Sequence, residues 1–133
     1  MPEGVVTHVE PVRFRDLDPM GHVNNAVFLT YLEQARIAFL EEMGVATGLG
    51  QMNMILARAE IDFRAPVRLG QEVEIAVRAS RCGTKSFELD YELTVDGTIV
   101  AEAKSVQVAY DYDRHEAVPL PSEWREKLSA VPA

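Results

Sequence analysis

Cysteine is almost absent from this sequence, which has only Cys82 among 133 residues. A single cysteine excludes an internal disulfide and fits a chain that folds in a reducing compartment. The sequence also lacks an N-terminal apolar run of the kind found in signal peptides, and it lacks an apolar stretch long enough to span a bilayer. We therefore expect a cytoplasmic protein.

Basic residues are scarce as well, with 13 Lys and Arg against 21 Asp and Glu and a formal net charge of −8. This balance disfavours nucleic acids and anionic membranes as partners, because both attract positive surfaces. It leaves room for a small polyanionic ligand wherever basic side chains lie together. The length fits one domain over residues 1–133, and a chain of this size buries roughly two thirds of its unfolded surface.

Several catalytic motifs are missing. The chain contains no Gly-x-Ser-x-Gly elbow, no glycine-rich phosphate loop and no Cys-x-x-Cys pair. Asp16, Asp18 and His22 lie within one short segment, and a single turn is a poor source of three zinc ligands. We therefore expect no bound metal.

The most informative stretch is residues 15–36, RDLDPMGHVNNAVFLTYLEQAR. Its first part has proline and glycine close together, which indicates a turn. A helix is predicted to start near Ala26 and to end before Gly44, which suits the left-handed residue just past a helix end. The first half of this helix is apolar nearly all round, which predicts burial on most sides. Apolar residues recur along it at spacings of three and four, at Phe28, Tyr31, Leu32, Ala35, Phe39 and Met43.

Five strands are predicted around this helix. Residues 5–15 contain Pro11, which indicates an edge position or a bulge. Alternation of apolar and polar residues predicts strands with one buried face in 52–65, 73–80 and 87–95. Asp96-Gly97 predicts a tight hairpin leading to a central strand from about Thr98 to Tyr112. The apolar residues of the alternating segments are Ile55, Ala57, Ala59, Ile61 and Phe63, then Val73, Ile75, Val77 and Ala79, then Phe87, Leu89, Tyr91, Leu93 and Val95.

The tail has prolines at 119 and 121, then Ser122 as a possible cap of a short helix that carries Trp124 and Leu128. The order is therefore one strand, one long helix and four further strands. A curved antiparallel sheet wrapped around the helix is the economical packing, because each strand has one apolar face.

Asp18 stands just ahead of the predicted helix start. Free backbone N–H groups in the first turn of a helix carry partial positive charge, so they can polarise a carbonyl or hold an oxyanion. A carboxylate beside them can serve as a base or a nucleophile. Together these groups have the outline of an acyl-transfer site.

The segment Asp-Leu-Asp-Pro-Met-Gly-His-Val-Asn-Asn at 16–25, followed by Tyr-Leu-Glu-Gln-Ala-Arg at 31–36, resembles the hotdog-fold thioesterases of the 4-hydroxybenzoyl-CoA thioesterase group. Its Asp-Leu-Asp and His-Val-Asn-Asn parts also resemble the acyl-carrier-protein thioesterases. The resemblance implies an α+β hotdog fold, in which a five-stranded curved antiparallel sheet wraps around one long central helix, with a short C-terminal helix. It further implies homodimers or homotetramers with sites between subunits, and it implies no cofactor, since CoA enters as part of the substrate.

The resemblance gives Asp18 the role of the catalytic acid, as nucleophile or as base for water, where the alternative is a turn aspartate. It gives His22 the role of orienting or deprotonating the attacking water. The carrier-protein enzymes have asparagine where this chain has Met20, so a structural role for His22 stays open. A backbone N–H at Asn25 would face the thioester oxygen. Gly21 and Asn24 complete the helix entry and would contact substrate.

For the phosphates of the ligand the resemblance points to the turn near Gly83, and the candidate side chains are Arg64, Arg81, Lys85 and Ser86. The alternative for each is an ordinary solvated side chain. Glu33 matches the helix carboxylate of another hotdog branch, but a solvated or dimer-contact role is favoured because the loop aspartate is present. Asp16 matches no catalytic position and is read as a local hydrogen-bonding or solvated residue.

These observations predict a hydrolase of acyl thioesters, with acyl-CoA as the substrate. The first alternative is an acyl-ACP thioesterase, whose carrier would need a basic docking patch. The second alternative is a domain that binds acyl thioesters without hydrolysing them.

Overall fold

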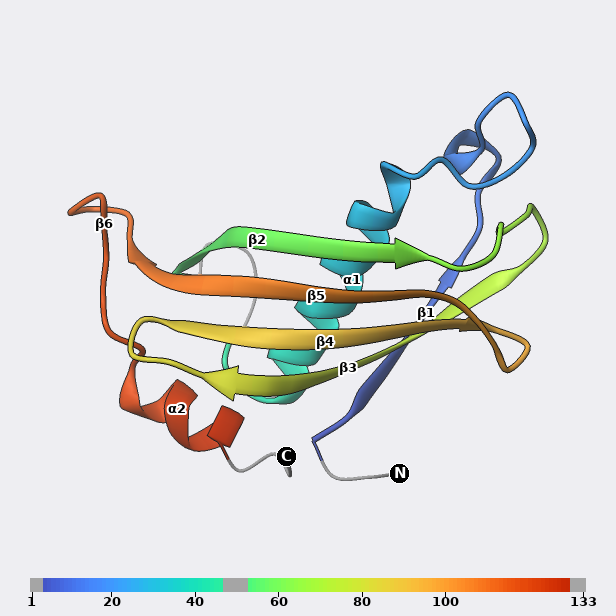
Figure 1. Ribbon diagram of the computed structural model, residues 1–133. Helices are drawn as coiled ribbons and strands as arrows, with labels where there is room; N and C mark the ends of the chain where they lie inside the picture. Colours follow the sequence, from blue (N-terminus) through green and yellow to red (C-terminus); the bar gives the residue numbers. More distant parts are fainter. Residues whose placement is uncertain (1–3, 47–52, 130–133) are drawn as a thin grey trace.

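The computed structural model describes residues 4–46 and 53–129. Its strands are β1 (Val6–Pro11), β2 (Met54–Phe63), β3 (Glu72–Cys82), β4 (Ser86–Val95), β5 (Thr98–Asp111) and β6 (Glu116–Ala117). The helices are η1 (Phe14–Asp16), α1 (Val27–Glu42) and α2 (Ser122–Ser129). All strand pairs are antiparallel, and the sheet runs in the order β1-β3-β4-β5-β2 with α1 behind it (Figure 1). The predicted five strands and two helices are confirmed, and the two-residue β6 and the short η1 were not predicted.

Helix α1 is the centre of the core. It lies closest to β1 and β3, and its end at Gly44, where φ is +73°, is as predicted. The prediction of burial on most sides is wrong for one stripe, where Leu29 is 48% exposed. The side chains that α1 buries against the sheet are Phe28, Tyr31, Leu32, Ala35, Phe39 and Leu40.

Strands β3 and β4 confirm the predicted alternation. Every predicted inward position of the two strands is buried in the core, while Glu72, Glu74 and Arg78 face outward. The hairpin is also confirmed, since Asp96 and Gly97 both have positive φ, at 50° and 81°. Strand β5 lies between β4 and β2, which is the predicted interior position.

Strand β2 departs from the prediction of one buried face. Ile55 is 38% exposed and Phe63 is 46% exposed, although both alternate correctly with polar residues. Met52, the first residue of the predicted strand, lies outside the described residues. The reason for the exposure is position, because among the described strands β2 is an edge strand that pairs only with β5, and α1 lies toward the opposite edge.

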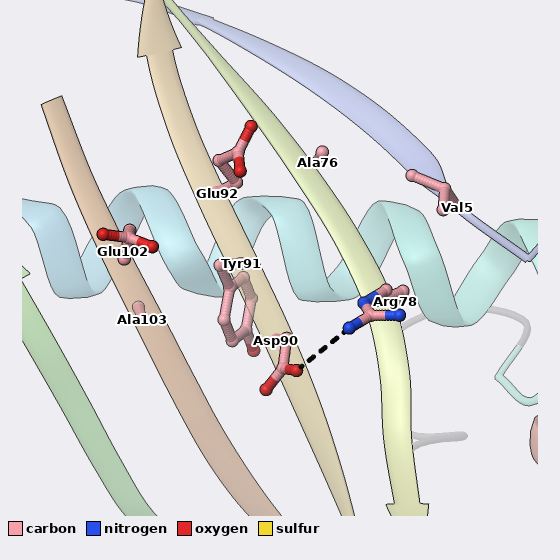
Figure 2. Close-up of a pocket in the computed structure, with 8 residues that line it drawn as sticks. All are labelled: Val5, Ala76, Arg78, Asp90, Tyr91, Glu92, Glu102 and Ala103. Atoms are coloured by element: carbon pink, nitrogen blue, oxygen red, sulfur yellow. Dashed lines mark ion pairs between the residues drawn. The ribbon is translucent and has the colours of Figure 1, made fainter. Parts of the chain in front are cut away.

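The outer face of the sheet is polar, as the alternation predicted. Asp90 on β4 lies between Arg78 on β3 and Lys104 on β5, at 3.8 Å from each cation. Arg78 and Asp90 lie side by side (Figure 2), and together with Glu92 and Glu102 they line a shallow hollow of about 370 Å³. Arg78, Asp90 and Lys104 balance one another across neighbouring strands, whereas Glu92 and Glu102 are like charges directly opposite each other in the register.

Helix α2 closes the far end of the sheet. Trp124 and Leu128 are buried in the core, as the tail pattern predicted. In the described part of the chain, no helix is both long enough and apolar enough to cross a membrane.

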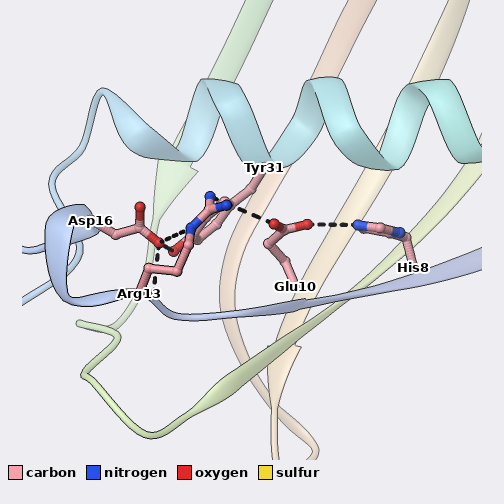
Figure 3. Close-up of polar contacts among 5 residues, drawn as sticks. All are labelled: His8, Glu10, Arg13, Asp16 and Tyr31. Atoms are coloured by element: carbon pink, nitrogen blue, oxygen red, sulfur yellow. Dashed lines mark hydrogen bonds and ion pairs between the residues drawn. The ribbon is translucent and has the colours of Figure 1, made fainter.

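A buried carboxylate fastens the start of α1 to the chain that leaves β1. Asp16 is 4% exposed, and its Oδ2 accepts hydrogen bonds from the Tyr31 hydroxyl at 2.7 Å and from the Arg13 backbone N–H at 2.9 Å. Figure 3 shows the chain of contacts continuing through Arg13 to Glu10 and His8. Burial raises the pKa of Asp16, but the hydrogen bonds from Tyr31 and Arg13 and the Arg13 charge outweigh it, so the pKa lies below its ordinary value.

Replacing Tyr31 by Phe should lower the free energy of unfolding at neutral pH by about 2 kcal/mol, because it removes a hydrogen bond to a buried carboxylate. The loss should shrink in acid. Since the folded-state pKa of Asp16 is depressed below 3.8, the stability that its ionised form contributes is present above that pH and disappears as the pH falls through the folded-state pKa.

Urea unfolding at a series of pH values measures this effect. Tyr110→Phe is the matched control, because its hydroxyl makes no hydrogen bond to any described residue and its loss should cost little. An equal loss in the two variants, or a loss for Tyr31→Phe that does not change in acid, would contradict the assignment.

Candidate active site

The segment between η1 and α1 folds as a small closed loop that presents Asp18. The Asn24 N–H donates to Asp16 O at 2.8 Å, and the Asp18 N–H donates to His22 O at 2.7 Å. Leu17 and Val23 form an isolated antiparallel bridge between these two bonds. The loop is therefore a miniature hairpin with Asp18 beside its tip.

The carboxylate of Asp18 is held by the backbone of its own loop. Its Oδ1 accepts from the Met20 N–H at 2.9 Å and from the His22 N–H at 3.3 Å. Gly21 makes this possible, because its φ of +84° is a conformation that residues with a Cβ rarely adopt. No described residue donates a hydrogen bond to Oδ2, so this oxygen is available to a ligand or a water molecule.

The entry to α1 leaves one backbone donor free. The N–H groups of Val27, Phe28 and Leu29 donate to backbone oxygens three residues earlier, and the Ala26 N–H donates to Asn24 Oδ1 at 2.8 Å. Asn24, rather than Asn25, thus supplies a side-chain acceptor just ahead of α1, whose N-cap residue Ala26 makes no side-chain cap hydrogen bond. Within the described residues the Asn25 N–H has no acceptor, and it is the donor that the sequence assigned to an oxyanion.

Asp18, His22 and Asn25 line one pocket of about 360 Å³. Its wall opposite the loop is the segment after β2, which is fixed by a hydrogen bond from the Val23 N–H to Val67 O at 2.8 Å. Phe28 of α1 and Phe63 of β2 meet edge to face, with ring centroids 5.2 Å apart, and form the apolar part of the lining. The full lining is Asp18, Met20, His22, Val23, Asn25, Phe28, Phe63, Arg64, Ala65, Pro66 and Val67.

His22 contributes its backbone to the loop and is one of the residues that line the pocket. No hydrogen bond joins its imidazole to Asp18 or to any other described side chain. Met20, which stands where the carrier-protein enzymes have asparagine, is 72% exposed at the rim. The arrangement holds the acid firmly and leaves the imidazole free to turn toward a ligand.

Arg64 is the one predicted phosphate ligand that lines this pocket. Its Nε donates to Glu102 at 3.2 Å, and its Nη2 lies 3.9 Å from Asp62. These two carboxylates already neutralise much of the positive charge of Arg64.

Arg81, Lys85 and Ser86 lie elsewhere. The strand register places Ser86 beside Val108, and Val108 beside Ile55, at the beginning of β2. The Asp18 pocket adjoins Phe63 at the other end of that strand, about 26 Å away at 3.3 Å per residue. A single chain therefore does not bring its acid and this turn together.

The structure also shows where Asp16 and Glu33 lie. Asp16 is a hydrogen-bonding residue as predicted, but it is buried rather than solvated. Glu33 is exposed on α1 in a groove that Leu29, Arg36 and Leu56 also line, away from Asp18. Among the described residues, no group of three or more His, Cys, Asp or Glu side chains is placed to hold a metal ion.

The sequence did not identify the apolar wall of the pocket. Phe28 was read only as a core residue of the helix, and Phe63 only as part of a strand face. Pro66 received no role in the sequence analysis, although its loop forms the far wall. A proline beside a buried valine was the available signal, but it does not say which loop it will face.

Residues 12–128 match the family model of the thioesterase-like superfamily. The chain is 32% identical to the long-chain acyl-CoA thioesterase FadM of Escherichia coli (strain K12), a match that spans 90% of this chain and 94% of that protein. It is 27% identical to a 1,4-dihydroxy-2-naphthoyl-CoA hydrolase of Synechococcus elongatus, over 88% of this chain and 90% of that protein.

Among solved structures, the chain is similar to a thioesterase from Thermus thermophilus in complex with coenzyme A and zinc. The identity is 38%, the TM-score is 0.86, and the match covers 97% of this chain and 96% of the other. This likeness confirms the predicted fold class.

Substituting alanine for Gly21 should strain the loop that holds Asp18, at a cost of roughly 1–2 kcal/mol in the free energy of unfolding. An added Cβ meets no atom within 4 Å, so the cost comes from backbone conformation alone. Gly97→Ala is the matched control, because Gly97 has nearly the same φ and equally open surroundings in the β4–β5 hairpin.

Urea unfolding should show similar losses for both variants. Backbone amide NMR spectra should separate them, with the signals of Met20 and His22 displaced only in Gly21→Ala. Unchanged signals for these two amides would mean that the loop holds Asp18 without needing the left-handed residue.

Proposed function

Because the chain belongs to the thioesterase-like superfamily, we propose that it hydrolyses acyl-CoA thioesters in the pocket lined by Asp18. The carrying observation is that Asp18 and Asn25 line the same pocket: among the described residues none donates to Asp18 Oδ2, and none accepts from the Asn25 N–H. A carboxylate and an N–H donor are the two groups that acyl transfer requires.

In the proposed reaction the thioester oxygen accepts a hydrogen bond from the Asn25 N–H, which stabilises the negative charge that develops there. Asp18 Oδ2 either removes a proton from a water molecule that attacks the carbonyl carbon, or attacks that carbon itself. The carbon–sulfur bond then breaks, and the thiolate leaves and takes up a proton. In the first route water supplies the new oxygen of the free acid directly. In the second route a mixed anhydride links the acyl group to Asp18, and water hydrolyses it to release the free acid and restore the Asp18 carboxylate. His22 can orient the water from its place in the pocket.

The acyl group would rest on the apolar part of the lining. Phe28 and Phe63 present ring edges and faces there, and Val23 and Val67 close the floor. Such a surface suits a hydrocarbon or aromatic acyl group rather than a charged one.

Coenzyme A is the proposed carrier because the relatives named above act on CoA esters or bind CoA. Basic side chains at the β3–β4 turn offer partners for its phosphates. Acyl carrier protein is the alternative carrier, and a binding domain without hydrolysis is the alternative class.

We further propose that two copies pair along β2. The strand is an unpaired sheet edge with Leu56 46% exposed, and Leu29 of α1 lies in the same groove. An open edge with apolar side chains tends to be covered by another chain. Antiparallel pairing about the middle of β2 would extend one sheet across both copies.

This pairing would complete the site. It would place the beginning of the partner's β2 beside Phe63, with the partner's β5 and β4 next in order. Three strand spacings of about 4.8 Å then separate the Asp18 pocket of one copy from the β3–β4 turn of the other, roughly 14 Å. The phosphate-binding residues and the acid would therefore come from different copies.

Asp18→Asn should reduce turnover of the best acyl-CoA by about 10²–10⁴-fold, because the amide can act neither as base nor as nucleophile. The fold should persist, since an amide oxygen can still accept from Met20 and His22. Thiol release from short, long, branched and aromatic acyl-CoA esters measures the rate.

Asp113→Asn, the same change at an exposed turn position, should leave the rate unaltered. If no ester of the panel is hydrolysed by the wild type, acyl-ACP is assayed next, and inactivity there as well would favour the binding domain. Retention of full activity in Asp18→Asn would exclude Asp18 from the chemistry.

Leu56→Arg should shift the protein toward monomers, because a large charged side chain would replace an apolar one in the groove that the second copy covers. Analytical ultracentrifugation over a range of concentrations measures the change. Leu69→Arg, at a leucine 51% exposed in the loop after β2, is the control and should not alter the mass. Equal dissociation in the two variants, or none in Leu56→Arg, would remove β2 as the contact.

A further inference from the structure

The turn between β3 and β4 is unusually well anchored. The Gly83 N–H donates to Ser86 O at 2.7 Å, which closes the turn across four residues. A Cβ at Gly83 would come within 3.2 Å of Ser86 Oγ, so the absence of a side chain lets the serine hydroxyl lie against the backbone. Contacts between residues of the turn itself therefore make it compact.

Three consecutive carbonyl groups of this turn are held from outside it. Arg125 of α2 donates through Nη2 to Gly83 O at 2.7 Å and to Thr84 O at 3.2 Å. The Leu120 N–H donates to Thr84 O at 2.9 Å, and the Ala109 N–H donates to Lys85 O at 2.9 Å. A hairpin turn exposed to water usually fluctuates, and these bonds to α2, the segment before it and β5 restrict that motion.

The same place gathers cations that have no ion-pair partner. Arg81, Lys85 and Arg125 form no ion pair with any described residue, whereas Arg78 and Lys104 on the neighbouring outer face do. Lys85 is exposed at the tip of the turn. In a chain with a net charge of −8, unpaired cations beside a fixed turn point to an anionic ligand rather than to a balanced surface.

We propose that Arg125 is a positioning residue for coenzyme A: through the carbonyls of Gly83 and Thr84 it fixes the turn whose Lys85 and Ser86 bind the phosphates. The proposal rests on the proposed function and extends the ligand site to α2. Arg125 directs its N–H groups at the backbone, so it acts on the ligand through the turn. Ordering Lys85 and Ser86 beforehand lowers the entropy lost when the phosphates bind.

A purely structural role for Arg125 would be the attachment of α2 to the sheet. The chain contains a comparison for that role, because Lys127 on the same helix donates to Gly44 O at 2.8 Å, at the end of α1 and outside the turn. Both side chains use a cation to bind a backbone carbonyl. Only Arg125 binds the turn.

The experiment compares Arg125→Ala, Arg125→Lys and Lys127→Ala with the wild type on two substrates that share one acyl group, the CoA ester and the pantetheine ester. The pantetheine ester lacks the nucleotide phosphates. In Arg125→Ala the KM for the CoA ester should rise about tenfold with kcat retained, and the KM for the pantetheine ester should change less than twofold. Arg125→Lys should recover part of the loss, because one donor and the charge remain.

Lys127→Ala should leave both KM values unchanged, and urea unfolding of all variants shows how much stability each side chain contributes. An equal rise of KM on both esters in Arg125→Ala, or the same CoA-specific rise in Lys127→Ala, would assign Arg125 to helix attachment. An unchanged KM for the CoA ester would also overturn the proposal.

Calorimetric binding of free coenzyme A separates this inference from the proposed hydrolysis. If the wild type hydrolyses neither ester but binds coenzyme A about tenfold more tightly than Arg125→Ala, the turn assignment stands and the hydrolase fails. If the wild type binds no coenzyme A, the turn assignment fails.

Discussion

The buried carboxylate of Asp16 is the contact on which the candidate site depends. Its side chain accepts from the Tyr31 hydroxyl and its backbone carbonyl accepts from the Asn24 N–H. The two bonds fasten both ends of the loop that carries Asp18 to one point, beside the first turns of α1. Tyr31 is fully buried in the core, so its hydrogen bond to Asp16 fixes the loop to a well-packed part of the structure. An acid in a surface loop without these bonds would have no fixed position relative to the Asn25 N–H.

Two aspartates separated by one residue thus have different surroundings, and only Asp18 lines the pocket. The Asp16 carboxylate is buried, and its oxygen Oδ2 already accepts from Tyr31 and Arg13. Its pKa lies low because these donors and the Arg13 charge outweigh the effect of burial, and it has no access to a ligand. Asp18 is only half-buried and has one oxygen bound by its own loop. The second oxygen accepts no hydrogen bond from a described residue, and Asp18 lines the pocket, so this oxygen is available to a ligand.

The sequence correctly predicted the strand faces and the hairpin turn, because these features depend on residues that are close together in the chain. Alternation places Val73 and Leu89 inside because each strand position is determined by its neighbours in the chain, and Asp96-Gly97 determines its turn through backbone conformation alone. The exposure of Phe63 was not predictable, because alternation tells which residues share a face but not which element covers it. Arg125 was missed for a related reason: its acceptors lie about 40 positions earlier, and no local pattern records such a contact.

The order of the strands explains why so much apolar surface is left at one edge. Strand β2 is the last strand of the sheet and follows α1 in sequence, so its outer edge and the stripe of α1 with Leu29 form one continuous open groove. In the same chain the acid lies at the end of β2 and the phosphate turn lies level with its beginning. In the proposed pairing the end of one β2 meets the beginning of another, which would bring the acid of one copy near the turn of the other. The exposed edge and the distance between the acid and the turn are thus both consequences of the position of β2, and the proposed second copy would cover the edge and shorten the distance.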